Sequence, residues 1–244
     1  MAEKEPGFFR RLIKGASAFW RAWTFLSENK LWTFMILPGM LSLMLAVGLI
    51  ASLYMGLTGA IAGLIPQNQT GFLWSLLQGF LSFMIFVISV ITTVFMYRIL
   101  ASVVVMPFLG PLLSRVETLL NGKATEVSIS KDIKNAIVGI WVSLKYAFVE
   151  IIFLILTLFT GPVQPFIMAA VSGYFLGRGS FDYLLEKHTL SLRERKERAK
   201  EFWPEMEGLG VMHFITLFIP IIGPLAAPGV SVTGAALIFY GEED

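Results

Sequence analysis

The stretch LWTFMILPGMLSLMLAVGLIASLYMGLTGAIAGLIPQNQTGFLWSLLQGFLSFMIFVISVITTVFMY, residues 31–97, contains no Asp, Glu, Lys, Arg or His. One helix needs roughly 20 apolar residues to cross about 30 Å of hydrocarbon, so this stretch is long enough for two spans. The uncharged polar residues PQNQTG, at 66–71, divide it into two parts. We therefore predict two long transmembrane helices, over residues 31–65 and 72–106, joined by a turn at 66–71.

The composition of the whole chain is typical of a membrane protein. Of its 244 residues, 56% are hydrophobic and 15% are charged, whereas a soluble domain has about 25% charged residues. The chain lacks the polar surface of a soluble domain, so we predict an all-α integral membrane protein with a single membrane domain over residues 1–244. The sequence contains no cysteine, which excludes disulfides and thiolate metal ligands.

The positive charges indicate how the chain lies in the membrane. Six Lys and Arg residues precede residue 31, and thirteen follow residue 97. Because cytoplasmic segments carry an excess of Lys and Arg, we expect both termini in the cytoplasm and the 66–71 turn outside. The sequence thus predicts a multi-pass protein of the plasma membrane.

The first 30 residues have the pattern of an amphipathic helix. Apolar residues recur at spacings of three and four, and cations lie largely between them. The apolar set is Phe8, Phe9, Leu12, Ile13, Phe19, Trp20, Trp23 and Leu26. Aromatic residues and cations in this arrangement favour a helix that lies in the membrane interface over residues 1–30. A helix packed on the cytosolic part of the protein itself is the alternative.

Two later apolar segments are interrupted by proline and glycine, LFTGPVQPFIMAAVSG at 158–173 and LFIPIIGPLAAPGV at 217–230. A proline in a helix interior costs about 3 kcal/mol, so these segments are expected to break. The arms after the breaks have about 12 residues, or about 18 Å of helix, which is too short to cross a bilayer. We predict two partly penetrating helical hairpins, over 137–177 and 209–241; two kinked full-length helices are the alternative. The predicted breaks are Pro38 (an entry kink of the first span), Pro111, Gly161, Pro162, Pro220, Gly223, Pro224 and Pro228.

Between the second span and the first hairpin, residues 107–136 are predicted to form helices on the cytosolic side. Gly110 followed by Pro111 is typical of a helix start, because the first helical N–H has no partner in any case. The free amides of Leu112 and Leu113 would then hold a small anion, with the Ser114 hydroxyl as a third donor. An ordinary helix start after a kinked connection is the alternative.

Residues 178–208 form the one strongly charged segment and are predicted to be helical and cytosolic. Its cations could attract an anionic substrate or lipid headgroups, but the pattern favours a plain cytosolic helix. Asp182, Glu186 and His188 lie close in sequence, but their spacing matches no metal signature. The sequence contains no phosphate-binding loop, nucleophile elbow or paired carboxylates with a partner histidine. We therefore expect no catalytic residue, no metal, no cofactor and no nucleic acid.

Four motifs carry a resemblance to a known family. They are ILP at 36–38, PFLGPLL at 107–113, FDYLLEKH at 181–188 and IPIIGPLAAPGVSVTGA at 219–235. With them the chain resembles the CysZ sulfate-permease family, which is related to the etoposide-induced protein 2.4 family. The resemblance implies two long transmembrane helices, shorter helices that penetrate part of the membrane, and assembly as oligomers. It also implies sulfate uptake across the bacterial inner membrane for cysteine biosynthesis.

The resemblance implies a set of anion-binding residues as well. The Gly-Leu-Leu-Ala-Glu motif of the family falls on residues 110–114, with Ser114 in the place of the glutamate. The arginine pair of the family falls on Trp32 and Thr33, with Lys30 as the nearby cation. The candidate anion-binding residues are therefore Lys30, Gly110, Leu112, Leu113 and Ser114.

Together these patterns predict an anion channel or permease, with sulfate as the leading substrate and helix N-termini along the path. The expected partners are sulfate or a related small anion, the lipid bilayer and further copies of the same chain. A membrane scaffold of the same fold that transports nothing is the alternative. A membrane enzyme is the weakest hypothesis, because the sequence contains no catalytic constellation.

Overall fold

The computed structural model describes residues 7–62, 71–104, 106–123, part of 141–157, 158–188, 191–219 and 222–241. Within these residues all regular secondary structure is helical. The helices are α1 (Phe8–Glu28), α2 (Thr33–Ala62), α3 (Phe72–Val104), α4 (Met106–Asn121), the short 3₁₀ helix η1 (Leu158–Val163), α6 (Gln164–Lys187), α7 (Leu192–Glu201), α8 (Trp203–Leu217) and α9 (Ile222–Tyr240). Most of the predicted 66–71 turn, residues 124–136 and Pro220 lie outside the described residues.

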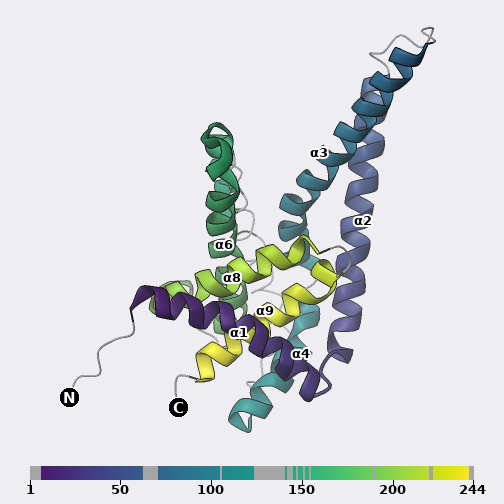
Figure 1. The fold of residues 1–244 in the computed structure, drawn as a ribbon. Helices are drawn as coiled ribbons and strands as arrows, with labels where there is room; N and C mark the ends of the chain where they lie inside the picture. Colours follow the sequence, from purple (N-terminus) through teal and green to yellow (C-terminus); the bar gives the residue numbers. More distant parts are fainter. Residues whose placement is uncertain are drawn as a thin grey trace.

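Helices α2 and α3 pack side by side and project far beyond the other helices (Figure 1). With 30 and 33 residues, they are about 45 and 50 Å long at 1.5 Å per residue. Their most apolar stretches, within Thr33–Ala62 and Phe72–Thr93, are only 19% and 17% buried, so most side chains of these two stretches are exposed. Length and composition thus make them two candidate membrane spans, at the positions that the charge-free stretch predicts.

Helices α2, α4 and α9 continue through the predicted breaks at positions 38, 111 and 228. Helix α9 runs through Pro228, and the predicted break there is wrong. The buried residues Ala226, Ala227 and Val230 hold the helix on both sides of this proline, and their packing offsets the hydrogen bond that proline cannot make. Helix α2 likewise runs from Thr33 through position 38 without ending.

The backbone does break at Gly161, whose φ of 58° and ψ of −131° are non-helical. A positive φ is readily adopted only by glycine, which is why the chain can turn at this point. Helix α6 follows and is a single helix of 24 residues. The predicted boundary between a hairpin ending at 177 and a cytosolic segment starting at 178 is therefore not a helix end.

Helices α8 and α9 are joined by residues 218–221 and contact each other. They have 15 and 19 residues, so α9 is longer than the arm of about 12 residues that the sequence predicts after this break. Gly223 and Pro224 lie in the first turn of α9 rather than at the apex. Proline is tolerated in this turn because the first N–H groups of a helix have no intrahelical acceptor.

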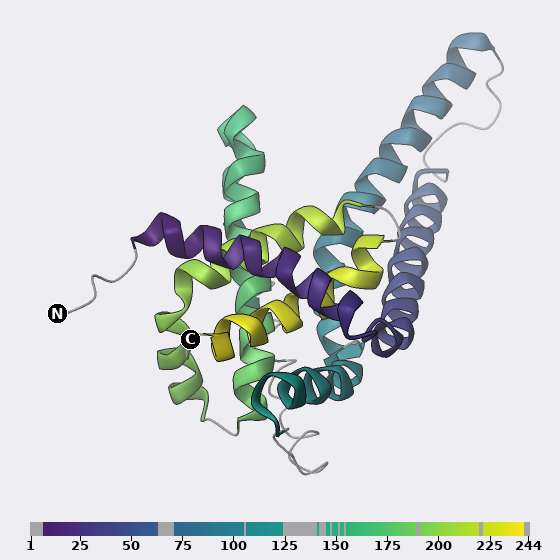
Figure 2. The same cartoon turned by 60° about the horizontal axis from the view of Figure 1, so that its bottom comes forward.

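Helix α1 crosses α8 and α9 and runs across the direction of α2 and α6 in both views (Figures 1 and 2). Glycines allow the close contacts in this region. A Cβ on Gly15 would overlap the Glu205 carbonyl oxygen, and one on Gly208 would overlap that of Leu12. Helices α6 and α8 meet in the same way at Gly177 and Gly210. Small residues at helix crossings are common in membrane proteins, where backbones must approach closely to gain van der Waals contact.

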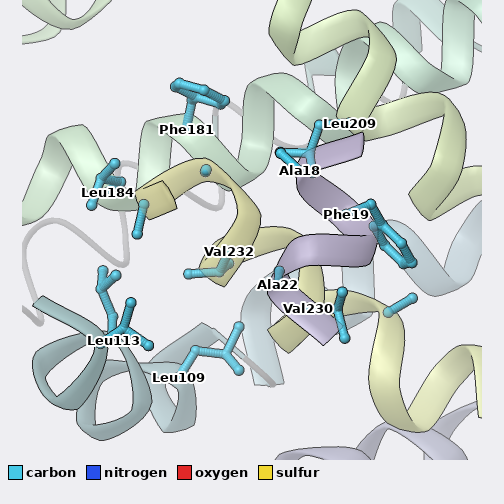
Figure 3. Close-up of a cluster of buried hydrophobic side chains, with 14 of the residues drawn as sticks. Ala18, Phe19, Ala22, Leu109, Leu113, Phe181, Leu184, Leu209, Val230 and Val232 are labelled. Atoms are coloured by element: carbon cyan, nitrogen blue, oxygen red, sulfur yellow. The ribbon is translucent and has the colours of Figure 1, made fainter. Parts of the chain in front are cut away.

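The apolar core lies where α1, α4, α6, α8 and α9 meet (Figure 3). The labelled core residues are Ala18, Phe19, Ala22, Leu109, Leu113, Phe181, Leu184, Leu209, Val230 and Val232. Helix α1 thus packs on the protein itself through one face, while Phe9, Ile13 and Trp20 on its other face are exposed. Its predicted position in the membrane interface stays a prediction.

Candidate functional site

A buried carboxylate, Glu117, lies at the centre of a group of polar side chains. Lys187 Nζ donates to its Oε2 at 2.6 Å, and the Tyr240 hydroxyl donates to its Oε1 at 3.1 Å. Lys187 Nζ also donates to Ser114 Oγ at 2.8 Å, and His188 Nε2 lies 2.8 Å from the Tyr240 hydroxyl. We call these five residues the Glu117 cluster.

Three helices supply the Glu117 cluster. Ser114 and Glu117 are three residues apart on α4 and therefore share a face of that helix. Lys187 ends α6 and His188 caps it, where the negative end of the helix dipole favours a cation. Tyr240 is the last residue of α9. The buried side chains of Leu112, Leu113 and Val116 on α4 belong to the apolar core that these helices share.

The hydrogen bonds define the protonation of the cluster. A tyrosine keeps its single hydroxyl proton at neutral pH, and Tyr240 uses that proton for Glu117. The Tyr240 oxygen must then accept from His188 Nε2, so this ring carries its proton on Nε2. Burial lowers the pKa of His188, against the opposite effect of the Glu117 charge. The histidine is thus neutral at neutral pH, and the ion pair of the cluster is the one between Lys187 and Glu117.

Lys187 is the one cation of this cluster, and its side chain is 11% exposed. An ammonium group has three N–H donors, and Glu117 and Ser114 account for two of them. Within the part of the chain that the structure describes, the third N–H of Lys187 has no acceptor. An ammonium beside a hydroxyl is a donor pair for an oxyanion, and the neighbouring carboxylate limits how strongly an anion is attracted.

Ser114 is the predicted site residue that belongs to this cluster. Gly110 lies one turn earlier, where an added Cβ would be 3.3 Å from the Tyr183 hydroxyl. Lys30 lies in the exposed turn between α1 and α2, with a positive φ of 55°. Among the described residues, no hydrogen bond or ion pair joins Lys30 to the cluster.

The predicted helix start at Pro111 is wrong. Helix α4 begins at Met106, so Pro111 lies inside it and the amides of Leu112 and Leu113 lie beyond its first turn. Only the first four N–H groups of a helix lack a partner, so these two amides are not the free donors that the sequence predicts. Both leucine side chains are fully buried in the apolar core.

The contact between Glu117 and Lys187 could not be predicted from the sequence, because 70 residues separate them. The one available signal was a charged residue within an apolar helical stretch. The other polar residues singled out near His188 make separate ion pairs: Asp182 with Arg178 at 2.9 Å, and Glu186 with Arg195 at 3.0 Å. Across the described residues, no group of three or more His, Cys, Asp or Glu side chains could hold a metal ion.

Two long, exposed apolar helices, α2 and α3, project from a core of further helices (Figure 1). This architecture, together with the polar cluster buried in the core, is that of an all-helical membrane protein. The chain belongs to the family described as sulfate transporter CysZ/etoposide-induced protein 2.4, whose family model matches residues 18–228. It is 26% identical over 227 residues to the sulfate transporter CysZ of Vibrio parahaemolyticus, covering 86% of this chain and 87% of the relative. It is 25% identical over 218 residues to the sulfate transporter CysZ of Vibrio atlanticus, covering 86% of this chain and 85% of the relative.

Proposed function

We propose that this chain moves sulfate, or a related small anion, across the plasma membrane as a channel or permease. The observation that carries this proposal is the family match over residues 18–228, together with relatives named sulfate transporters that cover 86% of the chain. The two exposed apolar helices α2 and α3 are long enough to anchor such a protein in a bilayer.

We propose that the anion meets Ser114 and Lys187 on its way. The Lys187 ammonium and the Ser114 hydroxyl are 2.8 Å apart, so one oxyanion can accept from both. Glu117 balances the charge of Lys187, which keeps the net attraction for an anion small. Weak binding suits conduction, because the ion must also leave. Helix N-termini along the rest of the path, such as the first turn of α9, would supply further donors.

The proposed topology follows from charge and helix length. Both termini are cytoplasmic in the bacterial inner membrane, because Lys and Arg flank the charge-free residues 31–97 on both sides. The Gly161 end of α6 and the junction at 218–221 enter the membrane part way as hairpins. Helix α1 lies in the interface, and several copies assemble into the working unit. The direction of α6, which projects the same way as α2 and α3 in Figure 1, supports this arrangement.

Sulfate uptake into proteoliposomes that hold the purified chain tests the proposal. We expect uptake to exceed that of protein-free vesicles and to be reduced by Ser114→Asp, because a second carboxylate would pair with Lys187. Ser114→Ala removes one hydrogen bond and should reduce uptake about twofold to tenfold, since such a bond contributes about 0.5–1.5 kcal/mol.

Thr118→Ala is the matched control on the same helix, because among the described residues the Thr118 hydroxyl donates only to the Ser114 carbonyl of the α4 backbone. Uptake by this variant should be close to that of the unchanged chain. Unchanged uptake in both Ser114 variants would place the anion path elsewhere. An absence of uptake by the unchanged chain would instead favour a membrane scaffold.

A further inference from the structure

Helix α1 has an apolar face that no described part of the chain covers. The helix packs on the core through Gly15, Ala18, Phe19, Ala22 and Leu26. On its outer side Phe9, Ile13 and Trp20 are 77%, 64% and 59% exposed. At about 100° per residue these three side chains lie within about 40° of one another. They therefore form one continuous stripe rather than scattered exposed residues.

The stripe continues onto α8. The rings of Phe8 and Phe9 are 5.5 Å apart, and the rings of Phe8 and Trp203 are 5.4 Å apart. Trp203 begins α8 and is exposed. We call the surface of Phe8, Phe9, Ile13, Trp20 and Trp203 the aromatic face. Exposed apolar surface of this kind, on residues that soluble proteins usually bury, marks an interaction site.

Cations border the aromatic face. Arg10 and Arg21 are exposed and lie on the polar flank of α1. Arg11 points the other way and pairs with Glu205 at 2.6 Å, with a further hydrogen bond to the Glu201 carbonyl oxygen. The one acidic residue of α1 is Glu28, at its far end. A stripe of aromatics with cations on its flank is the pattern of a helix that lies on a lipid surface.

We propose that the aromatic face docks onto anionic phospholipid and that this contact holds α8 at the membrane surface. Anionic headgroups neutralise Arg10 and Arg21, whereas a second copy of the same face would bring these cations together. Glycine contacts and the Arg11–Glu205 ion pair fix α1 to α8, so a lipid-bound α1 positions the start of the α8–α9 pair. This inference rests on the membrane placement in the proposed function, and its readout is lipid contact rather than sulfate flux.

Spin labels on single cysteines test this inference in the full chain, which has no cysteine of its own. Ile13→Cys and Trp20→Cys place labels on the aromatic face, and Ser17→Cys and Glu28→Cys place labels on the exposed polar flank. The labelled protein is reconstituted into phosphatidylcholine vesicles with and without phosphatidylglycerol. With phosphatidylglycerol we expect labels at 13 and 20 to collide with oxygen in the bilayer, and labels at 17 and 28 with a water-soluble nickel chelate.

Arg10→Gln combined with Arg21→Gln should weaken the dependence on phosphatidylglycerol, since each cation near an anionic surface strengthens lipid binding about fivefold. Both arginines are exposed, so size-exclusion profiles should not change. If labels at positions 13 and 20 collided with the water-soluble nickel chelate in every lipid mixture, the inference would be overturned. Dipolar broadening between labels at these positions would also overturn it, because a second copy would then cover the face.

Discussion

Lys187 and Glu117 are 70 residues apart in the chain, yet Lys187 Nζ lies 2.6 Å from Glu117 Oε2. The Glu117 side chain is 1% exposed and that of Lys187 is 11% exposed. This ion pair joins the end of α6 to α4. Because Tyr240 also donates to Glu117, the same carboxylate connects α4, α6 and α9 on the inside of the protein.

Lys187→Met should lower the stability of the folded protein. The substitution leaves the Glu117 charge buried without its cation, and removing one partner of a buried pair costs about 3–5 kcal/mol. Replacing Glu117 with Leu in the same chain removes the uncompensated charge and should restore most of the loss. Thermal unfolding of the purified variants in detergent measures both effects.

The exposed pair of Lys200 and Glu197 on α7 is the matched control. Its N–O distance is 3.0 Å, close to that of the buried pair, but both side chains are well exposed. Surface ion pairs contribute about 0–1 kcal/mol, so Lys200→Met should change the unfolding temperature little. Equal effects of Lys187→Met and Lys200→Met would contradict a buried role for the Glu117 cluster.

Gly177→Ala should disrupt the packing of α6 on α8. A methyl group at this position would overlap the Met206 carbonyl oxygen, which is backbone and cannot turn aside. Overpacking of this kind typically costs 1–3 kcal/mol. We expect a lower unfolding temperature and a smaller monodisperse fraction in size-exclusion chromatography.

Gly179→Ala provides the control two residues further along α6. No atom lies within 4 Å of a Cβ at this position, and alanine favours a helix over glycine by about 0.5–1 kcal/mol. This variant should be as stable as the unchanged chain or slightly more stable. A loss of stability in both variants would mean that helix propensity and flexibility, not the α6–α8 contact, control the result.

Cysteine labelling should place residues 179, 196 and 241 in the cytoplasm and residue 71 outside. Lys196 and Gly241 are exposed, whereas Glu205 is buried against Arg11 and makes a poor labelling site. The absence of native cysteine gives the experiment a clean background. External labelling at 196 or 241 would overturn the hairpin arrangement, since a full span after either break reverses the side of everything that follows.

The sequence was sufficient to predict α2 and α3 because helices that face lipid are apolar on all sides, so composition alone marks them. The turn at Gly161 was also predictable, since few residues other than glycine adopt its φ. The predictions at Pro111 and Pro228 were wrong, because whether a proline ends a helix depends on the packing of the residues around it. Helix α4 starts five residues before Pro111, and α9 is held by its buried alanines.

The site was less predictable than the fold. The sequence predicted the Ser114 hydroxyl as a third anion donor at a helix start, whereas in the structure this hydroxyl accepts a hydrogen bond from a lysine 73 residues away. Such pairings depend on how α4, α6 and α9 cross, and no local sequence pattern predicts how helices cross. Glu117 is noticeable in the sequence as a single acid within an apolar helical stretch, but no sequence pattern marks Lys187 or Tyr240 as its partners.

Glu207→Gln should make the protein more stable at alkaline pH. Burial on α8 raises the pKa of Glu207 from 4.5 to about 7. The folded state therefore holds this proton more tightly than the unfolded state, and the free energy of unfolding falls as pH rises from about 4.5 through 7. Glutamine keeps the shape of the side chain without the charge, so the variant should lose less stability over this range. Unfolding temperatures at pH 5 and pH 8 measure the difference, with Glu28→Gln on the exposed end of α1 as the control. If the unfolding temperature fell by the same amount between pH 5 and pH 8 in Glu207→Gln and in the unchanged chain, another group would control the pH dependence.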